Sequence, residues 1–339
     1  MKVSPGVALV VLMLAACLGP GEGRVAPLPT TPLFRASPSS AGAETANRPT
    51  AEVSPAKAGP EATPGVLKLS SPSALDTVCG GPAGLKSSLQ RLVSGAPSGE
   101  WAVYLHDLRG GTVVSINADQ PMHPASTIKV AIAIAFLRWF EAHPEVKWTS
   151  GPIPHQRSFE QLMRAMIVVS EEDATASLTD FLMDQKRIDL NREVQSWGAA
   201  ETSVVPRRST ARDLGLILER LASGDLLSEA GTDYLLALMR TPTPSKQTRL
   251  GAGLPPGPQD LLAHKTGTTF QAGLGVVADT GLVQWQGTSY VIVVLSSHVQ
   301  WVDYAAAQDL IAEISRVAFA CLAPETAWPA SSRRGGPNP

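Results

Sequence analysis

Residues 126–142 read STIKVAIAIAFLRWFEA, a strongly apolar run that predicts a helix opening at Ser126. Ser126 and Lys129 are three residues apart, so they share one face of that helix and the lysine ammonium can approach the serine hydroxyl. Serine is a weak nucleophile until a neighbouring base takes its proton. The N-terminus of a helix also directs backbone N–H groups towards a developing oxyanion. The run fits a nucleophilic serine, but S-x-x-K alone is a weak signal, and a capping serine beside a solvated lysine fits it equally well.

A second motif, Lys265-Thr266-Gly267-Thr268, lies in a stretch over residues 261–270 that we expect to be a strand. Its glycine lets a substrate backbone lie against the strand edge, and its lysine and threonines can bind a carboxylate. Taken alone, this motif also fits a strand end with a surface lysine. An S-x-x-K motif near a helix start, followed by K-T-G, is far more specific than either motif alone.

The remaining pattern puts strands at both ends of a folded region and helices in its middle. Helices are expected at residues 84–96, 158–184, 209–240 and 303–322, and strands at residues 100–108, 112–116, 273–285 and 289–299. The turn Arg109-Gly110-Gly111 joins the first two strands as a hairpin. This order indicates an α+β fold in which an antiparallel sheet joins both ends of the chain, with a helical subdomain between them.

S-x-x-K followed by K-T-G resembles the signature of the penicillin-recognising serine enzymes, namely class A β-lactamases and the transpeptidase domains of penicillin-binding proteins. The opening helix and hairpin, the helical middle, and the three late strands with a closing helix are similar to the class A arrangement. The resemblance covers roughly residues 80–322. It implies a class A β-lactamase-like fold, which is also the DD-peptidase/transpeptidase-like fold.

By position, the resemblance implies that Ser126 is the acylated nucleophile and that Lys129 is its base, directly or within a proton relay. The backbone N–H groups of Ser126 and Thr268 are then the oxyanion hole. The residues implied to bind the substrate and its carboxylate are Lys265, Thr266, Gly267 and Thr268.

Class A enzymes carry a third motif, S-D-N, in which the serine shuttles a proton and the asparagine binds the substrate amide. The matching stretch is MIVVSEEDAT at residues 166–175, so Ser170 matches the catalytic serine and Glu172 occupies the asparagine position. A carboxylate cannot donate an N–H, and it repels a substrate carboxylate unless a cation pairs with it, for which Lys129 and Lys265 are the candidates. Glu172 therefore departs from the family at a substrate-binding position, unless the acidic run is only a helix end.

A second departure concerns deacylation. Class A enzymes hydrolyse the acyl-enzyme with a glutamate in an E-x-x-L-N loop, but residues 197–213 read WGAAETSVVPRRSTARD, which is too short for that loop and lacks the motif. Asp189-Leu190-Asn191 lies upstream, within a helix that ends at Trp197-Gly198, so we do not interpret it as a substitute. Glu201 is the remaining candidate for a water-activating base, and it is not favoured. We therefore expect acylation to outrun deacylation.

The chain begins with MKVSPGVALVVLMLAAC at residues 1–17, where a basic start and an apolar run too short to span a bilayer indicate an export signal. The small residues before Cys17 resemble the bacterial lipobox, which implies that Cys17 is lipidated. The alternative is an ordinary signal peptide with an incidental cysteine. Either way we expect an exported protein, and the lipobox implies a membrane-anchored lipoprotein that faces the periplasm or the cell exterior.

Residues 18–75 are rich in Pro, Ala, Ser, Thr and Gly and predict a disordered linker, because they cannot bury enough apolar surface to fold. Residues 325–339 predict a disordered tail. One folded domain over residues 76–324 remains, with Cys79 near its start and Cys321 near its end. In an oxidising compartment these cysteines either pair or stay as buried free thiols. The class A resemblance puts the first and last helices side by side, which favours the disulfide.

The composition and the histidines exclude further classes of function. The 28 Lys and Arg residues against 30 Asp and Glu residues leave a net charge of −2, which argues against nucleic acid as a partner. The six histidines, at positions 106, 123, 143, 155, 264 and 298, lack metal-ligand spacing. His264 lies on the opposite strand face from Lys265, so we expect it to pack rather than to bind. We expect no metal, no cofactor and a monomer.

Three functions fit these observations. The favoured one is a serine hydrolase that opens β-lactam amide bonds through a Ser126 acyl-enzyme and deacylates slowly. The second is a penicillin-binding DD-peptidase that acts on peptidoglycan peptides. The third is a non-catalytic binding protein, which Glu172 and the shortened loop favour and the intact Ser126, Lys129 and Lys265 oppose.

Overall fold

The computed structural model describes residues 79–111, 113–152, 157–257 and 262–323. The predicted signal peptide with Cys17, the predicted linker and the predicted tail lie outside the described residues. Among the helices that are described, none combines the length and the apolar character needed to cross a bilayer.

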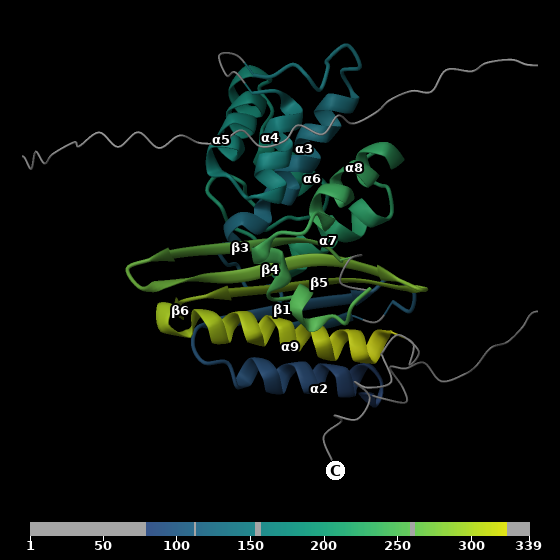
Figure 1. The fold of residues 1–339 in the computed structure, drawn as a ribbon, viewed down its shortest axis with the longest axis vertical. Helices are drawn as coiled ribbons and strands as arrows, with labels where there is room; N and C mark the ends of the chain where they lie inside the picture. Colours follow the sequence, from purple (N-terminus) through teal and green to yellow (C-terminus); the bar gives the residue numbers. More distant parts are fainter. Residues whose placement is uncertain (1–78, 112, 153–156, 258–261, 324–339) are drawn as a thin grey trace, which may run out of the picture. The chain divides into compact units, whose positions relative to one another are not determined.

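The centre of the domain is an antiparallel sheet with the strand order β2-β1-β5-β4-β3 (Figure 1). Its strands are β1 (Glu100–Asp107), β2 (Val113–Ile116), β3 (Leu262–Gln271), β4 (Leu274–Trp285) and β5 (Thr288–Ser297), and β6 (Val299–Gln300) pairs with β4. The N-terminal hairpin joins the C-terminal strands through β1 and β5, where Val103 lies opposite Val294. The predicted sheet from both ends of the chain is confirmed, and β3, which carries K-T-G, lies at its edge.

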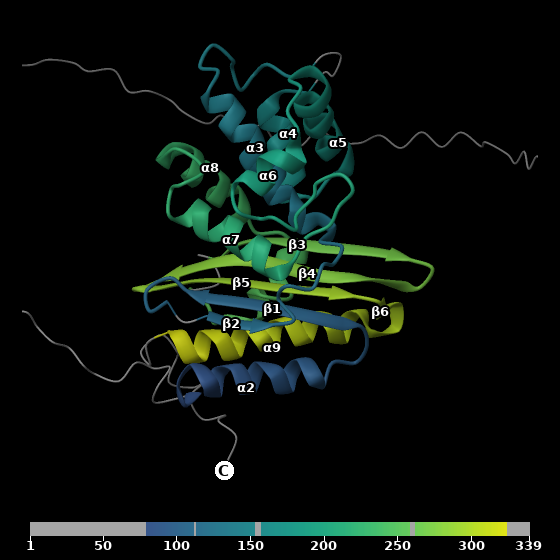
Figure 2. The same ribbon diagram turned by 180° about the vertical axis from the view of Figure 1, so that it is seen from behind.

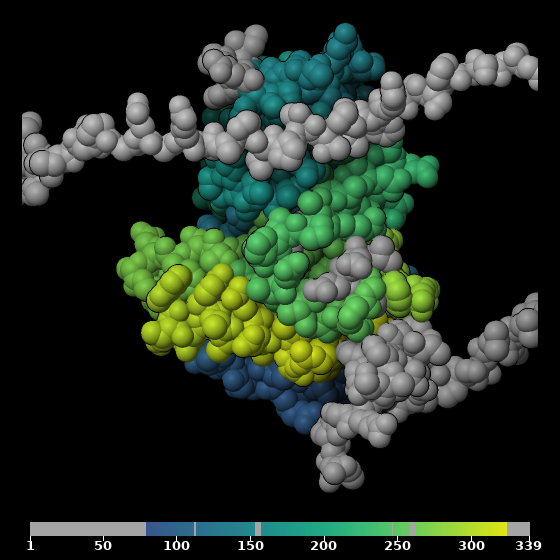
Figure 3. Space-filling model, viewed as in Figure 1, coloured from purple at the N-terminus to yellow at the C-terminus, as the bar shows by residue number. Residues whose placement is uncertain are grey.

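Helices cover both faces of this sheet (Figures 1 and 2). The described helices are α2 (Gly81–Ser94), α3 (Lys129–Glu141), α4 (Phe159–Val168), α5 (Glu172–Asp180), α6 (Leu190–Ser196), α7 (Ala211–Ala222), α8 (Glu229–Arg240) and α9 (Tyr304–Leu322). α2 and α9 lie side by side on one face, and both reach the outer surface of the domain in Figure 3. The other helices lie on the opposite face.

β5 shows how one strand contributes to both cores. Ile292 and Val294 pack beneath α2 and α9, whereas Val291 and Val293 pack against the helical region. Side chains of a strand alternate between the two faces of a sheet, and here both faces are buried. The strand is therefore apolar along nearly its whole length, as the sequence SYVIVVL at residues 289–295 reads.

A disulfide ties α2 to α9. It joins Cys79 to Cys321, which are 242 residues apart in the chain and have their Cα atoms 5.6 Å apart. Closing so long a loop removes conformational entropy from the unfolded chain, which stabilises the domain by up to about 5 kcal/mol on the chain-entropy model. The bond therefore holds the two ends of the domain together beneath the sheet.

The helical region has α3 at its centre. Every residue from Lys129 to Leu137 is buried, and the ring of Phe136 contacts those of Trp139 and Phe159. A helix that is buried on all sides occupies a core position. Because the turn before α3 contacts β3, this core fixes the start of α3 against the edge of the sheet.

Two of the local departures from regular helix in this region lie at the start of α3 and between α4 and α5. The helix predicted to open at Ser126 starts instead as a 3-10 turn, Ala125–Ile128, and becomes α-helical at Lys129. The chain enters this turn at Ala125 with a φ of 49°, in the left-handed region, so regular helix cannot extend further back. The second departure is Ser170, whose φ of 63° separates α4 from α5.

Candidate active site

The turn that carries Ser126 packs directly against β3 at Gly267. A Cβ atom added at Gly267 would lie 2.9 Å from the carbonyl oxygen of Pro124 and 3.1 Å from the backbone nitrogen of Ser126. Glycine is the residue that permits so close an approach between strand and turn. This contact brings the S-x-x-K and K-T-G motifs together, although they lie far apart in the chain.

Ser126 and Lys129 are both buried, with exposed fractions of 8% and 0%. The Ser126 hydroxyl donates a hydrogen bond to Oε1 of Glu172 over 3.4 Å. Lys129 Nζ donates to the same oxygen over 2.6 Å, and to the backbone oxygen and the hydroxyl of Ser170 over 2.7 and 3.3 Å. Among the described residues, the hydrogen bonds of Lys129 go to Ser170 and Glu172, and none goes to the Ser126 hydroxyl. Ser126 and Lys129 instead share Oε1 of Glu172, the first residue of α5.

Two cations hold the Glu172 carboxylate. Lys129 binds Oε1, and Arg207 donates to Oε2 over 2.7 Å. Burial acts to raise the pKa of Glu172, but the hydrogen bonds and charges of Arg207 and Lys129 lower it to about 2. Glu172 is thus ionised at neutral pH. Of the two lysines expected to pair with it, Lys129 does so, whereas Lys265 binds Ser170.

Ser170 lies between the two lysines. Its hydroxyl accepts a hydrogen bond from Lys265 Nζ over 2.9 Å and one from Lys129 Nζ over 3.3 Å. Burial lowers the pKa of Lys129, while the hydrogen bond and the charge of Glu172 act in the opposite direction. A left-handed serine beside buried cations is the kind of strained backbone that is found at functional sites. Ser126, Lys129, Ser170, Glu172 and Lys265 thus form one polar cluster.

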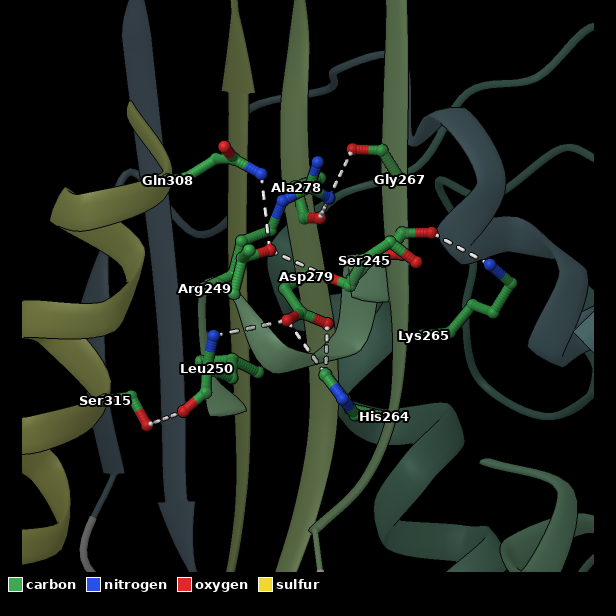
Figure 4. Close-up of polar contacts among 12 residues, drawn as sticks. Ser245, Arg249, Leu250, His264, Lys265, Gly267, Ala278, Asp279, Gln308 and Ser315 are labelled. Carbon is green, nitrogen blue, oxygen red and sulfur yellow. Dashed lines mark hydrogen bonds and ion pairs between the residues drawn. The ribbon is translucent and has the colours of Figure 1, made fainter. Parts of the chain in front are cut away.

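Behind β3, a buried arginine fixes the K-T-G strand. Arg249, with an exposed fraction of 2%, donates to the backbone oxygens of Gly267 and Ala278 over 3.0 and 2.7 Å (Figure 4). Its guanidinium also hydrogen-bonds the hydroxyls of Thr268 and Tyr304. Thr268 is therefore held from behind the strand. The sequence analysis missed Arg249, because a single arginine within an irregular segment gives no local signal.

His264 packs on the face of β3 away from Lys265, as expected. Its Nδ1 lies 2.9 Å from Oδ2 of Asp279 (Figure 4), and Asp279 also accepts a hydrogen bond from the backbone nitrogen of Leu250 over 3.3 Å. On the other face, Lys265 Nζ also donates to the carbonyl oxygen of Thr266 over 3.0 Å. His264 thus braces β3 against the segment that precedes it, whereas Lys265 contributes to the cluster.

The shortened segment over residues 199–209 contributes Arg207, which the sequence analysis also missed. Asn191 of α6 holds this segment, because its Oδ1 accepts hydrogen bonds from the backbone nitrogens of Val204 and Val205 over 2.7 and 3.2 Å. The Arg207-Arg208 pair after a proline was the available signal, but a surface pair of arginines is common and does not by itself indicate a partner.

The carboxylates weighed as substitutes for the missing glutamate have other partners. Glu201 is exposed and accepts a hydrogen bond from Arg208 over 3.0 Å. Asp189 caps α6 by accepting a hydrogen bond from the backbone nitrogen of Arg192 over 3.0 Å. Within the described ranges, no group of three or more His, Cys, Asp or Glu residues could hold a metal ion.

Residues 84–322 match the family model described as "Beta-lactamase enzyme family". This match spans most of the chain, so the protein belongs to the β-lactamase enzyme family and is a β-lactamase-like serine hydrolase with the class A fold. A sequence comparison with curated proteins finds no match.

Solved structures agree with this assignment. A point mutant of PBP-A, solved as an acyl-enzyme complex with penicillin-G, is 26% identical, with 70% of this chain and 95% of that chain covered and a TM-score of 0.60. The TLA-3 extended-spectrum β-lactamase is 19% identical, with 72% and 100% covered and a TM-score of 0.64. A β-lactamase from Chitinophaga pinensis is 21% identical, with 69% and 97% covered and a TM-score of 0.59. The last two comparisons show a shared fold only.

The contact at Gly267 can be tested by adding one methyl group. We predict that Gly267→Ala lowers the rate of reaction with a penicillin at least tenfold, because the new Cβ displaces the backbone of Ser126. The rate is measured as covalent adduct formed per unit time by intact-mass spectrometry. Gly95→Ala, where the added Cβ makes only an ordinary contact at 3.4 Å, is the matched control. An unchanged rate in Gly267→Ala would contradict the role of this contact.

Proposed function

We propose that the protein opens β-lactam amide bonds through an acyl-enzyme on Ser126 and hydrolyses that acyl-enzyme slowly. The observation that carries this proposal is the cluster in which Lys129 and Lys265 both donate to Ser170 beside a buried Ser126. Ser126 is the nucleophile, and Lys129 belongs to the proton relay. Ser170 passes a proton to the leaving nitrogen.

The K-T-G strand supplies the binding groups in this proposal. The backbone N–H groups of Ser126 and Thr268 form the oxyanion hole, supported by the close packing of the Ser126 turn on β3. Lys265, Thr266 and Thr268 bind the substrate carboxylate, and Gly267 leaves the edge of β3 open to the substrate backbone. Glu172 lines the substrate side of the cluster, with 58% of its side chain exposed.

Slow deacylation follows from the partners of the remaining carboxylates. An ester is hydrolysed rapidly only when a base activates a water molecule at its carbonyl carbon. Glu201 is paired with Arg208 and Asp189 caps a helix, so both are engaged away from Ser126. The acyl-enzyme is therefore expected to accumulate.

A peptidoglycan peptide is the second candidate substrate. Beyond Thr268, β3 continues past a cavity of about 460 Å³ that is lined by residues including His123, Thr269 and Gln271. Because β3 is an edge strand, an extended peptide can add to it through backbone hydrogen bonds. On the same scaffold, the protein would then act as a DD-peptidase.

We predict that incubation of residues 18–339 with a penicillin and a cephalosporin gives a stable adduct on Ser126, seen by intact mass and peptide mapping. Ser126→Ala should abolish the adduct without loss of fold, because it removes only the nucleophile. Ser177→Ala, on the exposed side of α5, should react like the wild type. Consumption of the drug without an adduct would mean rapid deacylation. An unreacted drug would favour the peptide substrate or a non-catalytic binding role.

We also propose that the protein is exported and anchored to a membrane by a lipid on Cys17, as the lipobox-like sequence before it supports. The linker over residues 18–75 would then hold the domain away from the membrane surface. We predict that Cys17→Ser moves the protein from the membrane fraction to the soluble fraction of the cells. A wild-type protein extracted from membranes whose mass shows no lipid on Cys17 would rule out the lipid anchor.

A further inference from the structure

The Ser126 hydroxyl has a carboxylate, and not an amine, as its hydrogen-bond acceptor among the described residues. Its acceptor is Oε1 of Glu172 at 3.4 Å. This distance is long for a hydrogen bond between oxygens, but catalytic hydrogen bonds are often long without substrate and shorten in the reacting complex. Glu172 is therefore within reach of the proton that Ser126 has to lose.

Lys129 has no free position for that proton. An ammonium has three N–H donors, and Lys129 Nζ has three acceptors: the backbone oxygen of Ser170, the hydroxyl of Ser170 and Oε1 of Glu172. To act as the base, Lys129 would have to turn a lone pair towards the Ser126 hydroxyl, but the three contacts of its Nζ are with Ser170 and Glu172.

We propose that Glu172, and not Lys129, takes the proton from Ser126 when the acyl-enzyme forms. This inference rests on the Ser126 acyl-enzyme proposed above and assigns one step within it. It also gives a catalytic role to the residue that departs from the family pattern at this position. The cationic partners of Glu172 keep its carboxylate ionised but also make it a weak base, so it holds the proton only until Lys129 takes it.

All bonds and protons of this step are accounted for by the substrate and the residues of the cluster. Ser126 Oγ forms a bond to the carbonyl carbon of the substrate amide, and its proton passes to Oε1 of Glu172. When the carbon–nitrogen bond breaks, Ser170 gives its hydroxyl proton to the leaving nitrogen. Lys129 returns a proton to Ser170 over 3.3 Å and recovers one from Glu172 over 2.6 Å. The net change is one proton moved from Ser126 to the leaving nitrogen.

The same geometry explains why Glu172 does not also drive hydrolysis. A water molecule that bridges two oxygens holds them about 4.5 Å apart, because each hydrogen bond spans about 2.8 Å and the two bonds meet at a near-tetrahedral angle. Oε1 of Glu172 is only 3.4 Å from Oγ of Ser126, so it contacts the future ester oxygen directly. The hydrogen bond from Arg207 to Oε2 favours this position of the carboxylate over one that admits a water. Glu172 is thus placed for acylation and not for deacylation.

The test is the rate of adduct formation with a penicillin in Glu172→Gln, using residues 18–339. We expect a loss of about 10² to 10⁴-fold, the range for removing a general base. If Lys129 were the base, removing Glu172 would lower the pKa of Lys129 further, and the adduct would form as fast or faster. Glu171→Gln is the matched control, because Glu171 pairs with Arg157 at the surface and also acts on Lys129 through its charge. The control should react like the wild type.

The pH profile gives a second readout. The charged groups that face Glu172 are Lys129 on α3 and Arg207 in the 199–209 segment, and Lys265 lies beyond Ser170. Since the pKa of Glu172 is about 2, its carboxylate is ionised throughout pH 5 to 8 and the acylation rate should be flat there. With Lys129 as the base, the rate would rise with pH through the range in which Lys129 loses its proton, because the neutral amine is the reactive form.

Glu172→Asp covers the case in which the glutamine variant does not fold. It keeps the charge but shortens the side chain, so it should react more slowly than the wild type, and faster than Glu172→Gln where that variant folds. If Glu172→Gln forms the adduct as fast as the wild type, the inference is overturned. The same holds if the aspartate and glutamine variants both form it equally slowly. In either case the Ser126 acyl-enzyme still stands. Absence of any adduct in the wild type, with the drug left unreacted, would overturn both.

Discussion

The fully buried ammonium of Lys129 is the constraint on which the rest of the site depends. A charge removed from water is tolerated only when neighbouring groups replace its hydration. Ser170 and Glu172 supply the three acceptors, and this requires α4 to end, the chain to turn through a left-handed Ser170, and α5 to begin with a carboxylate. Arg207 then donates a hydrogen bond to the second oxygen of that carboxylate. The local structure between α4 and α5 can thus be understood as the solvation shell of one lysine.

The sheet supplies the second half of the site, because it brings the two ends of the chain to a fixed edge. Its two buried faces and the Cys79–Cys321 disulfide make it rigid, and Arg249 holds the K-T-G strand from behind. Gly267 then lets the strand touch the turn that carries Ser126. The groups proposed to be catalytic therefore lie against a well-packed sheet, which favours reaction with little reorganisation.

The sequence predicted the elements whose pattern is local. The strands of the sheet are apolar or alternate regularly, α3 is a largely apolar run, and the two motifs carry the proposed nucleophile and the proposed substrate strand. It did not predict the 3-10 turn at Ser126, and it missed Arg207 and Arg249. These features depend on contacts between distant residues, such as Arg207 with Glu172, and a distant contact leaves no period or spacing to detect. Glu172 was recognised as unusual, but its position between Ser126 and Lys129 follows only from the packed helices.

A crystal structure of residues 18–339 trapped with penicillin tests the central claim most directly, namely that these groups act together at Ser126. The account predicts continuous electron density from Oγ of Ser126 to the opened lactam, with the carbonyl oxygen between the N–H groups of Ser126 and Thr268. Glu172 should remain bound to Lys129 and Arg207, with no water between its carboxylate and the ester. Density attached to another residue, or an ordered water held by Glu172 against the ester carbon, would contradict the account.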